Sequence, residues 1–226
     1  MNASQVTPSV HAIELLRVKA HAVIEGDDVS LVDSGYAGSL PRIERALGEH
    51  RRSVDHVRRV VCTHGHPDHA GGARALADLG VEVLIHPADA TNLEIGLGDA
   101  LRNPSRGRFF AAMTPPLPNF TPIGDGDVLP ILGGLQVIHT PGHTPGSVCL
   151  YAREHGLLFV GDTLQRRFGR VSFASGLYSD DPAAARSSVQ RLADLDVETI
   201  VFSHYPPLRH DAAGTLAKLA RHASDP

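Results

Sequence analysis

The chain has 226 residues, 42% of them hydrophobic and 20% charged, with a formal net charge of −4 at pH 7. This length and composition predict a single soluble domain, residues 1–226, with a substantial core. The absence of a long apolar run argues against a membrane partner, and the negative charge gives no general attraction to nucleic acid.

The number and spacing of cysteines and histidines narrow the class of protein further. Cys62 and Cys149 belong to no spaced cluster, so they are expected to be core residues rather than parts of a disulfide framework or a Cys-rich zinc site. Residues 1–10 lack the basic and apolar regions of a secretory signal, which predicts a cytoplasmic protein. The unusual number is histidine, with 14 residues, several of them close together.

The first part of the chain predicts an antiparallel meander followed by alternating helices and strands. The expected elements are strands 11–18, 20–25, 29–33, 57–62 and 81–85, with helices 40–49 and 73–79 before the last two. This order places a histidine-rich loop directly after strand 57–62. The carboxyl ends of such strands are where open α/β sheets bind ligands.

Residues 96–122 break the pattern, because five prolines surround Phe109, Phe110 and Met113. A long irregular stretch with aromatic residues predicts an active-site lid, with Phe109 and Phe110 as pocket walls. The alternatives are a contact between subunits or a disordered loop.

The rest of the chain repeats the logic of the first half. The expected elements are strands 128–132, 135–139, 147–151, 157–160 and 199–202, and helices 182–195 and 212–222. Two β-rich halves with helices after each predict an α/β (α+β) fold, a four-layer αββα sandwich with helices outside two packed sheets.

The strongest chemical signal is the segment that runs from Thr63 to His69. It contains His64, His66, Asp68 and His69, four metal-competent side chains, and imidazole and carboxylate suit zinc, or iron or manganese. Alternate side chains of an extended segment share a face, so His64 and His66 can hold one ion. The turn at Pro67 would direct Asp68 and His69 toward a second ion. Without metal, these groups would repel one another on protonation.

Three more candidate ligands stand at the ends of predicted strands: His143, Asp162 and His204. Singly, each has an ordinary alternative, a hydrogen-bonded histidine or a helix cap. Together with the histidine-rich segment, they favour metal binding.

These residues resemble the signature of the metallo-β-lactamase superfamily, His-x-His-x-Asp-His followed by a His, an Asp and a final His. The resemblance runs from residue 11 to about residue 210 and implies the αββα sandwich. It also includes the segment Leu31-Val32-Asp33-Ser34-Gly35, in which Asp33 would orient a ligand.

Carried over by position, the resemblance implies two divalent metal ions, with zinc expected first and iron or manganese as alternatives. The first ion would be bound by His64, His66 and His143, the second by Asp68, His69 and His204, and both by Asp162. Two such ions lower the pKa of a shared water, so that hydroxide can attack a carbonyl or phosphoryl group. Asp68, as the catalytic residue, would also position this hydroxide or accept its proton.

The Gly-Asp-Thr-Leu setting of Asp162 is similar to the glyoxalase II branch, because true β-lactamases lack this bridging carboxylate. A glyoxalase II carries a helical extension after its last metal histidine, whereas 22 residues follow His204 here, so acylglutathione is not assumed as substrate. Lactonases of the superfamily place a tyrosine three residues after the bridging aspartate. Gln165 stands there in this chain, and Tyr178 or Tyr205 could substitute.

Several residues are candidates for binding the substrate, each with an ordinary structural alternative. Three arginines after Asp162 could bind a carboxylate or phosphate, or could lie on a solvated loop: Arg166, Arg167 and Arg170. Tyr178 and Tyr205 are candidate pocket walls, and His86 is a candidate hydrogen-bond partner of a ligand. The remaining histidines are expected to be surface or packing residues: His11, His21, His50, His56, His155, His210 and His222.

Three classes of function compete. The first is a dinuclear hydrolase acting on a small ester, thioester or lactone, in a monomer or homodimer, with phosphodiesters as a related alternative. The second is a mononuclear iron persulfide dioxygenase, whose branch uses the equivalents of His64, His143 and Asp162. The third, a non-catalytic binding protein, is disfavoured because every ligand is present.

Overall fold

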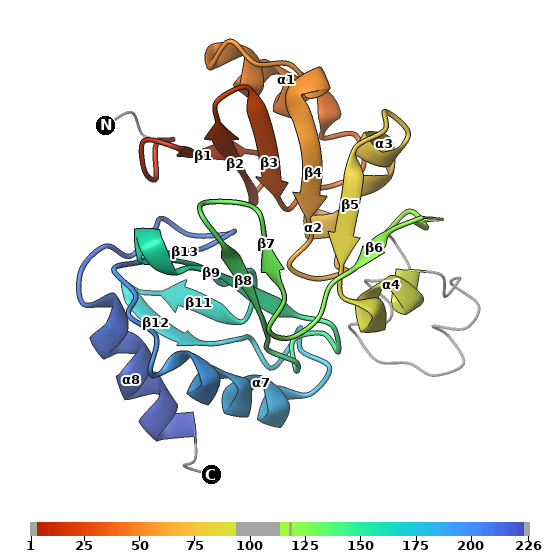
Figure 1. Ribbon diagram of the computed structural model, residues 1–226. Coiled ribbons are helices and arrows are strands. Elements are labelled where there is room, and N and C mark those ends of the chain that lie inside the picture. Colours follow the sequence, from red (N-terminus) through yellow and green to blue (C-terminus); the bar gives the residue numbers. More distant parts are fainter. Residues whose placement is uncertain (1–3, 94–113, 118, 224–226) are drawn as a thin grey trace.

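The computed structural model describes residues 4–93, 114–117 and 119–223, and shows two β-sheets packed face to face with helices on the outside (Figure 1). The first sheet has the order β1-β2-β3-β4-β5-β6 and the second the order β13-β10-β9-β8-β7. The first consists of β1 (Val10–Glu14), β2 (Lys19–Glu25), β3 (Asp28–Val32), β4 (Val57–Val61), β5 (Glu82–Ile85) and β6 (Thr121–Pro122). The second consists of β7 (Val128–Leu129), β8 (Leu135–His139), β9 (Val148–Ala152), β10 (Leu157–Phe159) and β13 (Thr199–Val201).

The strand directions confirm the predicted meander and bring several strand ends to one rim. Strands β1, β2 and β3 are antiparallel, whereas β3, β4, β5 and β6 run parallel. In the second sheet, β10 is antiparallel to β9 and parallel to β13. Parallel neighbours end at the same edge of a sheet, so the loops after β3 and β4, and those after β10 and β13, leave their sheets side by side.

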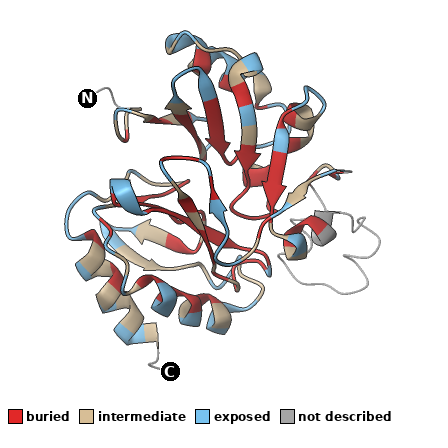
Figure 2. Ribbon diagram, viewed as in Figure 1, coloured by how far each residue is buried: buried red, intermediate tan, exposed pale blue. Residues whose placement is uncertain are grey.

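Three separate apolar layers confirm the four-layer sandwich, and Figure 2 shows the buried positions concentrated along the strands. Strand β9 illustrates the alternation that creates them. Val148 and Leu150 belong to the layer between the sheets, while Cys149 and Tyr151 belong to the layer beneath the C-terminal helices. All four are at most 1% exposed. Full burial of one such aliphatic side chain stabilises the fold by about 1.5–3 kcal/mol.

The outer helices follow local signals in the sequence. Helix α1 (Leu40–Glu49) has a proline in its first turn and buries Ile43 and Leu47, four residues apart. Helix α8 (Ala212–Ala223) also forms as predicted. Helix α7 (Pro182–Ser188) starts where Asp181 accepts hydrogen bonds from two backbone amides, but it is shorter than predicted. Residues Val189–Leu192 continue it as a tighter 3₁₀ turn.

Several short elements were not predicted. They are α2 (Pro67–Ala70), α4 (Pro87–Leu93), β6 and the hairpin of β11 (Leu164–Arg167) with β12 (Arg170–Phe173); α3 (Ala73–Ala77) matches the predicted helix 73–79. The prediction that Arg166, Arg167 and Arg170 lie in a loop is therefore wrong. Phe168 and Gly169, with φ of 50° and 78°, turn the chain between two antiparallel strands.

The predicted lid, residues 96–122, lies mostly outside the described residues, as do Phe109 and Phe110. Its described end is part of the fold, because Leu117 is 2% exposed within the first apolar layer and Thr121–Pro122 forms β6. In the part of the chain that the structure describes, no helix combines the length and apolarity needed to cross a bilayer.

A buried histidine on β2 links stability to pH. His21 is 2% exposed, and its ring meets that of Phe159 edge-on at 5.6 Å between centroids. Burial lowers the pKa of His21 to about 4, against the opposing charge of Asp33. The folded state therefore holds this imidazole neutral, whereas the unfolded chain protonates it below about pH 6.5. The contribution of His21 to stability is complete above that pH and is lost as the pH drops from about 6.5 to about 4.

We expect this titration to lower the free energy of unfolding by about 3 kcal/mol at its acid limit. Replacing His21→Leu should remove most of this loss, while the exposed His155→Gln should keep it. Urea unfolding of the three proteins at pH 7.5 and 4.5, in the presence of a chelator, provides the measurement. An equal pH-dependent loss in His21→Leu and wild type would show that His21 titrates normally.

Candidate metal centre

The seven predicted ligands meet at the rim where the two sheets come together. Four of them lie on the two segments that follow strand β4 of the first sheet, namely the loop after β4 and helix α2. The second sheet supplies the rest from the loop between β8 and β9 and from the ends of β10 and β13. A hydrogen bond of 2.9 Å from the Val148 amide to the Thr63 carbonyl joins the two sheets beside this point.

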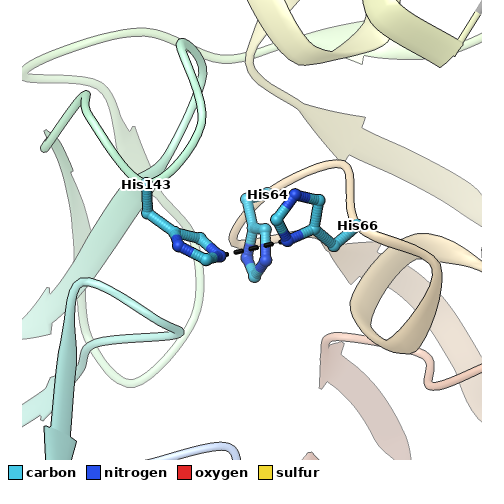
Figure 3. Close-up of side chains that lie close together, drawn as sticks. All are labelled: His64, His66 and His143. Atoms are coloured by element: carbon cyan, nitrogen blue, oxygen red, sulfur yellow. Dashed lines mark hydrogen bonds between the residues drawn. The ribbon is translucent and has the colours of Figure 1, made fainter. Parts of the chain in front are cut away.

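One group of side chains consists of His64, His66 and His143, called the first cluster here. The three imidazoles lie at most 5% exposed and face one another from two loops (Figure 3). Nε2 of His143 is 3.0 Å from Nδ1 of His66, and the ligand atoms of all three lie within 4.8 Å of one another. Nε2 of His64 is buried without a hydrogen-bond partner among the described residues. A buried polar atom of this kind fits metal coordination.

The second cluster consists of Asp68, His69 and His204. Nε2 of His204 lies 3.3 Å from Oδ2 of Asp68 and 3.3 Å from Nε2 of His69. Asp68 and His69 both sit on helix α2, whereas His204 follows β13. One carboxylate and two imidazoles converging on a point are a ligand set suited to zinc or iron.

Asp162 lies between the two clusters and directs one oxygen toward each. Its Oδ1 is 3.5 Å from Nε2 of His69 and 3.3 Å from Nε2 of His204, while its Oδ2 is 3.6 Å from Nε2 of His143. Gly161 makes this approach feasible, because a Cβ at that position would lie 2.7 Å from Oγ1 of Thr63. The arrangement fits a carboxylate shared by two cations.

Asp33 fixes the orientation of His69. Its carboxylate, 0% exposed, accepts hydrogen bonds from the Thr63 amide at 2.8 Å and from Nδ1 of His69 at 2.8 Å. Oγ of Ser203 donates to it at 3.2 Å. With Nδ1 engaged as a donor, His69 presents Nε2 to the cluster.

A backbone carbonyl does the same for His204. Nδ1 of His204 donates to the carbonyl of Arg17 at 2.8 Å, which leaves Nε2 facing Asp68 and Asp162. In both histidines of the second cluster, Nδ1 is thus engaged by a fixed acceptor and Nε2 is directed toward the cluster.

Without metal, the two clusters differ in protonation state. Burial, with the neighbouring imidazoles, lowers the pKa of His64 well below its usual range and that of His66 to about 3. Burial also acts to lower the pKa of His69 and His204, but the nearby carboxylates outweigh it and raise these values to about 9 and about 11. Without metal, the first cluster is neutral and the second carries protons beside its carboxylates. A cation placed there would replace those protons.

A cavity of about 730 Å³ opens over the site. Its walls include three residues singled out in the sequence: Arg167, Tyr178 and Tyr205. Arg166 instead donates to the Pro206 carbonyl at 3.5 Å, and Arg170 is exposed on the hairpin.

Two further residues line the cavity, Tyr36 and Gln165, and only Gln165 was singled out in the sequence. Tyr36 was missed, although it follows the segment that contains Asp33 and so leaves the same sheet edge as the ligands. Gln165, which the sequence resemblance singled out, also lines the cavity.

Among the described residues, no hydrogen bond joins the candidate partner His86 to any of the seven predicted ligands. Its ring stacks on that of His139 at 4.2 Å, and its Nδ1 accepts a hydrogen bond from the Ala88 amide at 3.2 Å. These contacts place His86 at the start of helix α4. Among the other histidines, His11 packs against His50 with ring centroids 3.9 Å apart, as expected of a packing residue.

The sequence profile of the Metallo-beta-lactamase superfamily matches residues 15–204. The chain belongs to this superfamily. It is 36% identical over 188 residues to an uncharacterized protein of Mycobacterium leprae, covering 78% of this chain and 79% of that protein. It is 32% identical over 149 residues to the hydroxyacylglutathione hydrolase of Aeromonas hydrophila, covering 63% of this chain. The match spans 45% of that enzyme's length.

Solved structures agree on the fold. A metallo-beta-lactamase family protein from Thermus thermophilus superposes with a TM-score of 0.77 at 24% identity, covering 96% of this chain and 80% of that one. TTHA1623, crystallised in a di-iron-bound form, superposes with a TM-score of 0.69 at 29% identity, covering 93% and 97%. The superfamily consists mostly of hydrolytic metalloenzymes, and this chain has the corresponding fold with clustered histidines and aspartates.

Proposed function

We propose that the protein is a glyoxalase II-like hydrolase that binds two divalent metal ions and cleaves a small ester, thioester or lactone. The observation that carries this proposal is the position of Asp162, with one oxygen toward each cluster. His64, His66 and His143 would hold one ion, and Asp68, His69 and His204 the other. Zinc suits this mixture of imidazole and carboxylate. The hydroxyacylglutathione hydrolase relative supports thioester chemistry.

When bound, the ions supply Lewis acidity that makes water nucleophilic near neutral pH. Asp68 is placed to assist, because its partly exposed carboxylate lies both in the second cluster and in the wall of the cavity. Burial acts to raise the pKa of Asp68, but His69 and His204 lower it overall, so the group stays ionised. An ionised Asp68 can orient a water molecule and accept its proton.

Tyr36 also lines the cavity and can bind the substrate. Burial, together with the charges of Asp68 and Asp162, raises the pKa of Tyr36, which keeps the phenol protonated as a hydrogen-bond donor. Gln165 offers an amide donor in the same cavity. These two side chains would steady the substrate oxygen on which charge develops.

Removing the Tyr36 hydroxyl should therefore weaken turnover without affecting metal binding. For Tyr36→Phe we expect kcat/KM to fall roughly 5-fold, the equivalent of one hydrogen bond of about 1 kcal/mol. Steady-state kinetics and metal content, measured on the same preparation, test this expectation. Unchanged kcat/KM would exclude Tyr36 from substrate binding.

The function itself is tested by supplying zinc or iron during expression and assaying a panel of esters, thioesters and lactones. We expect close to two ions per chain and hydrolysis of at least one substrate class. Less than one ion per chain, with no hydrolysis, would contradict the proposal. A single iron with oxygen uptake on glutathione persulfide would instead identify a dioxygenase.

A further inference from the structure

A buried carboxylate outside the seven candidate ligands joins the two loops of the first cluster. Asp89, on helix α4, is 1% exposed. Its Oδ2 accepts hydrogen bonds from the Gly65 amide at 2.7 Å and from Oγ1 of Thr144 at 2.7 Å. Its Oδ1 accepts one from the Gly146 amide at 2.6 Å. Gly65 separates His64 from His66, and Thr144 directly follows His143, so a single side chain holds both loops.

Burying the carboxylate of Asp89 costs free energy unless both loops stay in position and keep their hydrogen bonds to it. The three hydrogen-bond donors to Asp89 in the described chain are neutral groups, two backbone amides and one hydroxyl. Burial raises the pKa of Asp89, and these three hydrogen bonds oppose the shift. A buried carboxylate is tolerated only when its oxygens are satisfied. Displacing either loop would remove at least one of the three hydrogen bonds that satisfy Asp89.

The glycines on both loops permit this close approach. A Cβ at Gly146 would lie 2.7 Å from the backbone nitrogen and from Oδ1 of Asp89. A Cβ at Gly65 would lie 3.3 Å from the Asp89 Cβ. Thr144 is itself fixed, because Oγ of Ser147 lies 2.7 Å from its Oγ1. The loops are therefore shaped around the carboxylate.

We propose that Asp89 is a positioning residue for the first cluster: it sets the separation of the loop that carries His64 and His66 from the loop that carries His143. It complements Asp33, which contacts a histidine of the second cluster. The two buried aspartates thus support different clusters. The proposal rests on the proposed function for the binding of two ions, whereas the contacts of Asp89 with both loops do not depend on it.

Three variants test the role of Asp89. Asp89→Asn keeps the shape but turns one oxygen into a donor, which then faces a donor of one loop. Thr144→Val removes a single hydrogen bond and leaves Asp89 intact. Asp127→Asn is the matched control, because this exposed carboxylate also accepts a backbone hydrogen bond, from the Gly124 amide at 2.7 Å, in a surface turn.

The measurement is a titration of each metal-free protein with zinc against a chromophoric chelator, and with cobalt followed by its visible spectrum. For Asp89→Asn we expect one of the two ions to bind about 10- to 100-fold more weakly, with the other within a few-fold of wild type. Thr144→Val should show a smaller change of the same kind, and Asp127→Asn none. In the metal-free protein, the Gly65 and Gly146 amides should exchange hydrogen faster in Asp89→Asn.

Wild-type affinity for both ions in Asp89→Asn, or equal weakening of both, would overturn the proposal. If Asp89→Asn does not fold, Thr144→Val decides by the same criterion. The titration needs no turnover, so a wild-type protein that binds two ions but hydrolyses none of the panel would contradict the proposed function and leave this test intact.

Discussion

Replacing Asp162→Ala is expected to lower kcat/KM by about 10³-fold, because an ion contributes several kcal/mol to stabilising charge in the transition state. The variant should also hold fewer ions, since Asp162 directs one carboxylate oxygen toward each cluster. Metal analysis and kinetics on the same preparation measure the two effects together.

The control for this variant is Asp125→Asn, which alters an exposed carboxylate that pairs with Arg191 at 2.8 Å. It should keep wild-type metal content and turnover. An Asp162→Ala protein with two ions and full activity would remove the bridging role. Loss of activity with both ions retained would assign Asp162 to a later step than metal binding.

The second large effect is expected at Asp33, which is fully buried and is not among the residues that line the cavity. Asn is the suitable replacement, because residue 33 has a φ of 62°, a conformation that asparagine tolerates well. The amide cannot stabilise a charged His69 as the carboxylate does. We expect metal affinity to fall about 10- to 100-fold, as for other residues that orient a metal-binding histidine.

A spectroscopic measurement separates this role from simple destabilisation. In the metal-free protein, the pKa of His69 is raised to about 9, partly by Asp33, and Asp33→Asn should lower it. Histidine NMR resonances followed against pH report this change. Ser203→Ala, which removes another partner of Asp33, should leave the pKa of His69 near its wild-type value. An unchanged titration in Asp33→Asn would contradict the orienting role.

Much of the fold could be predicted because its signals are local. The alternation in β9 and the four-residue spacing of Ile43 and Leu47 directly encode which face of each element is buried. Short elements were missed because periodicity needs length. Helix α2 has only 4 residues, and β11 and β12 also have 4 residues each, which is too short for a periodic pattern to stand out.

Some residues of the candidate site could likewise be predicted from the sequence, and others could not. His64, His66, Asp68 and His69 stand within one short segment, so their chemistry is visible as a motif. Asp89 has no such signal, because its role depends on two loops that meet it only in the folded chain. Tyr36 and Asp89 thus show what tertiary packing adds to a motif.

The most direct test of the two-ion site is anomalous diffraction from crystals of the zinc-supplemented protein, recorded on both sides of the zinc absorption edge. We expect two peaks about 3.5–4 Å apart, on either side of the Asp162 carboxylate, one bound by the first cluster and one by the second. A single peak, or two peaks with Asp162 bound to neither, would contradict the account.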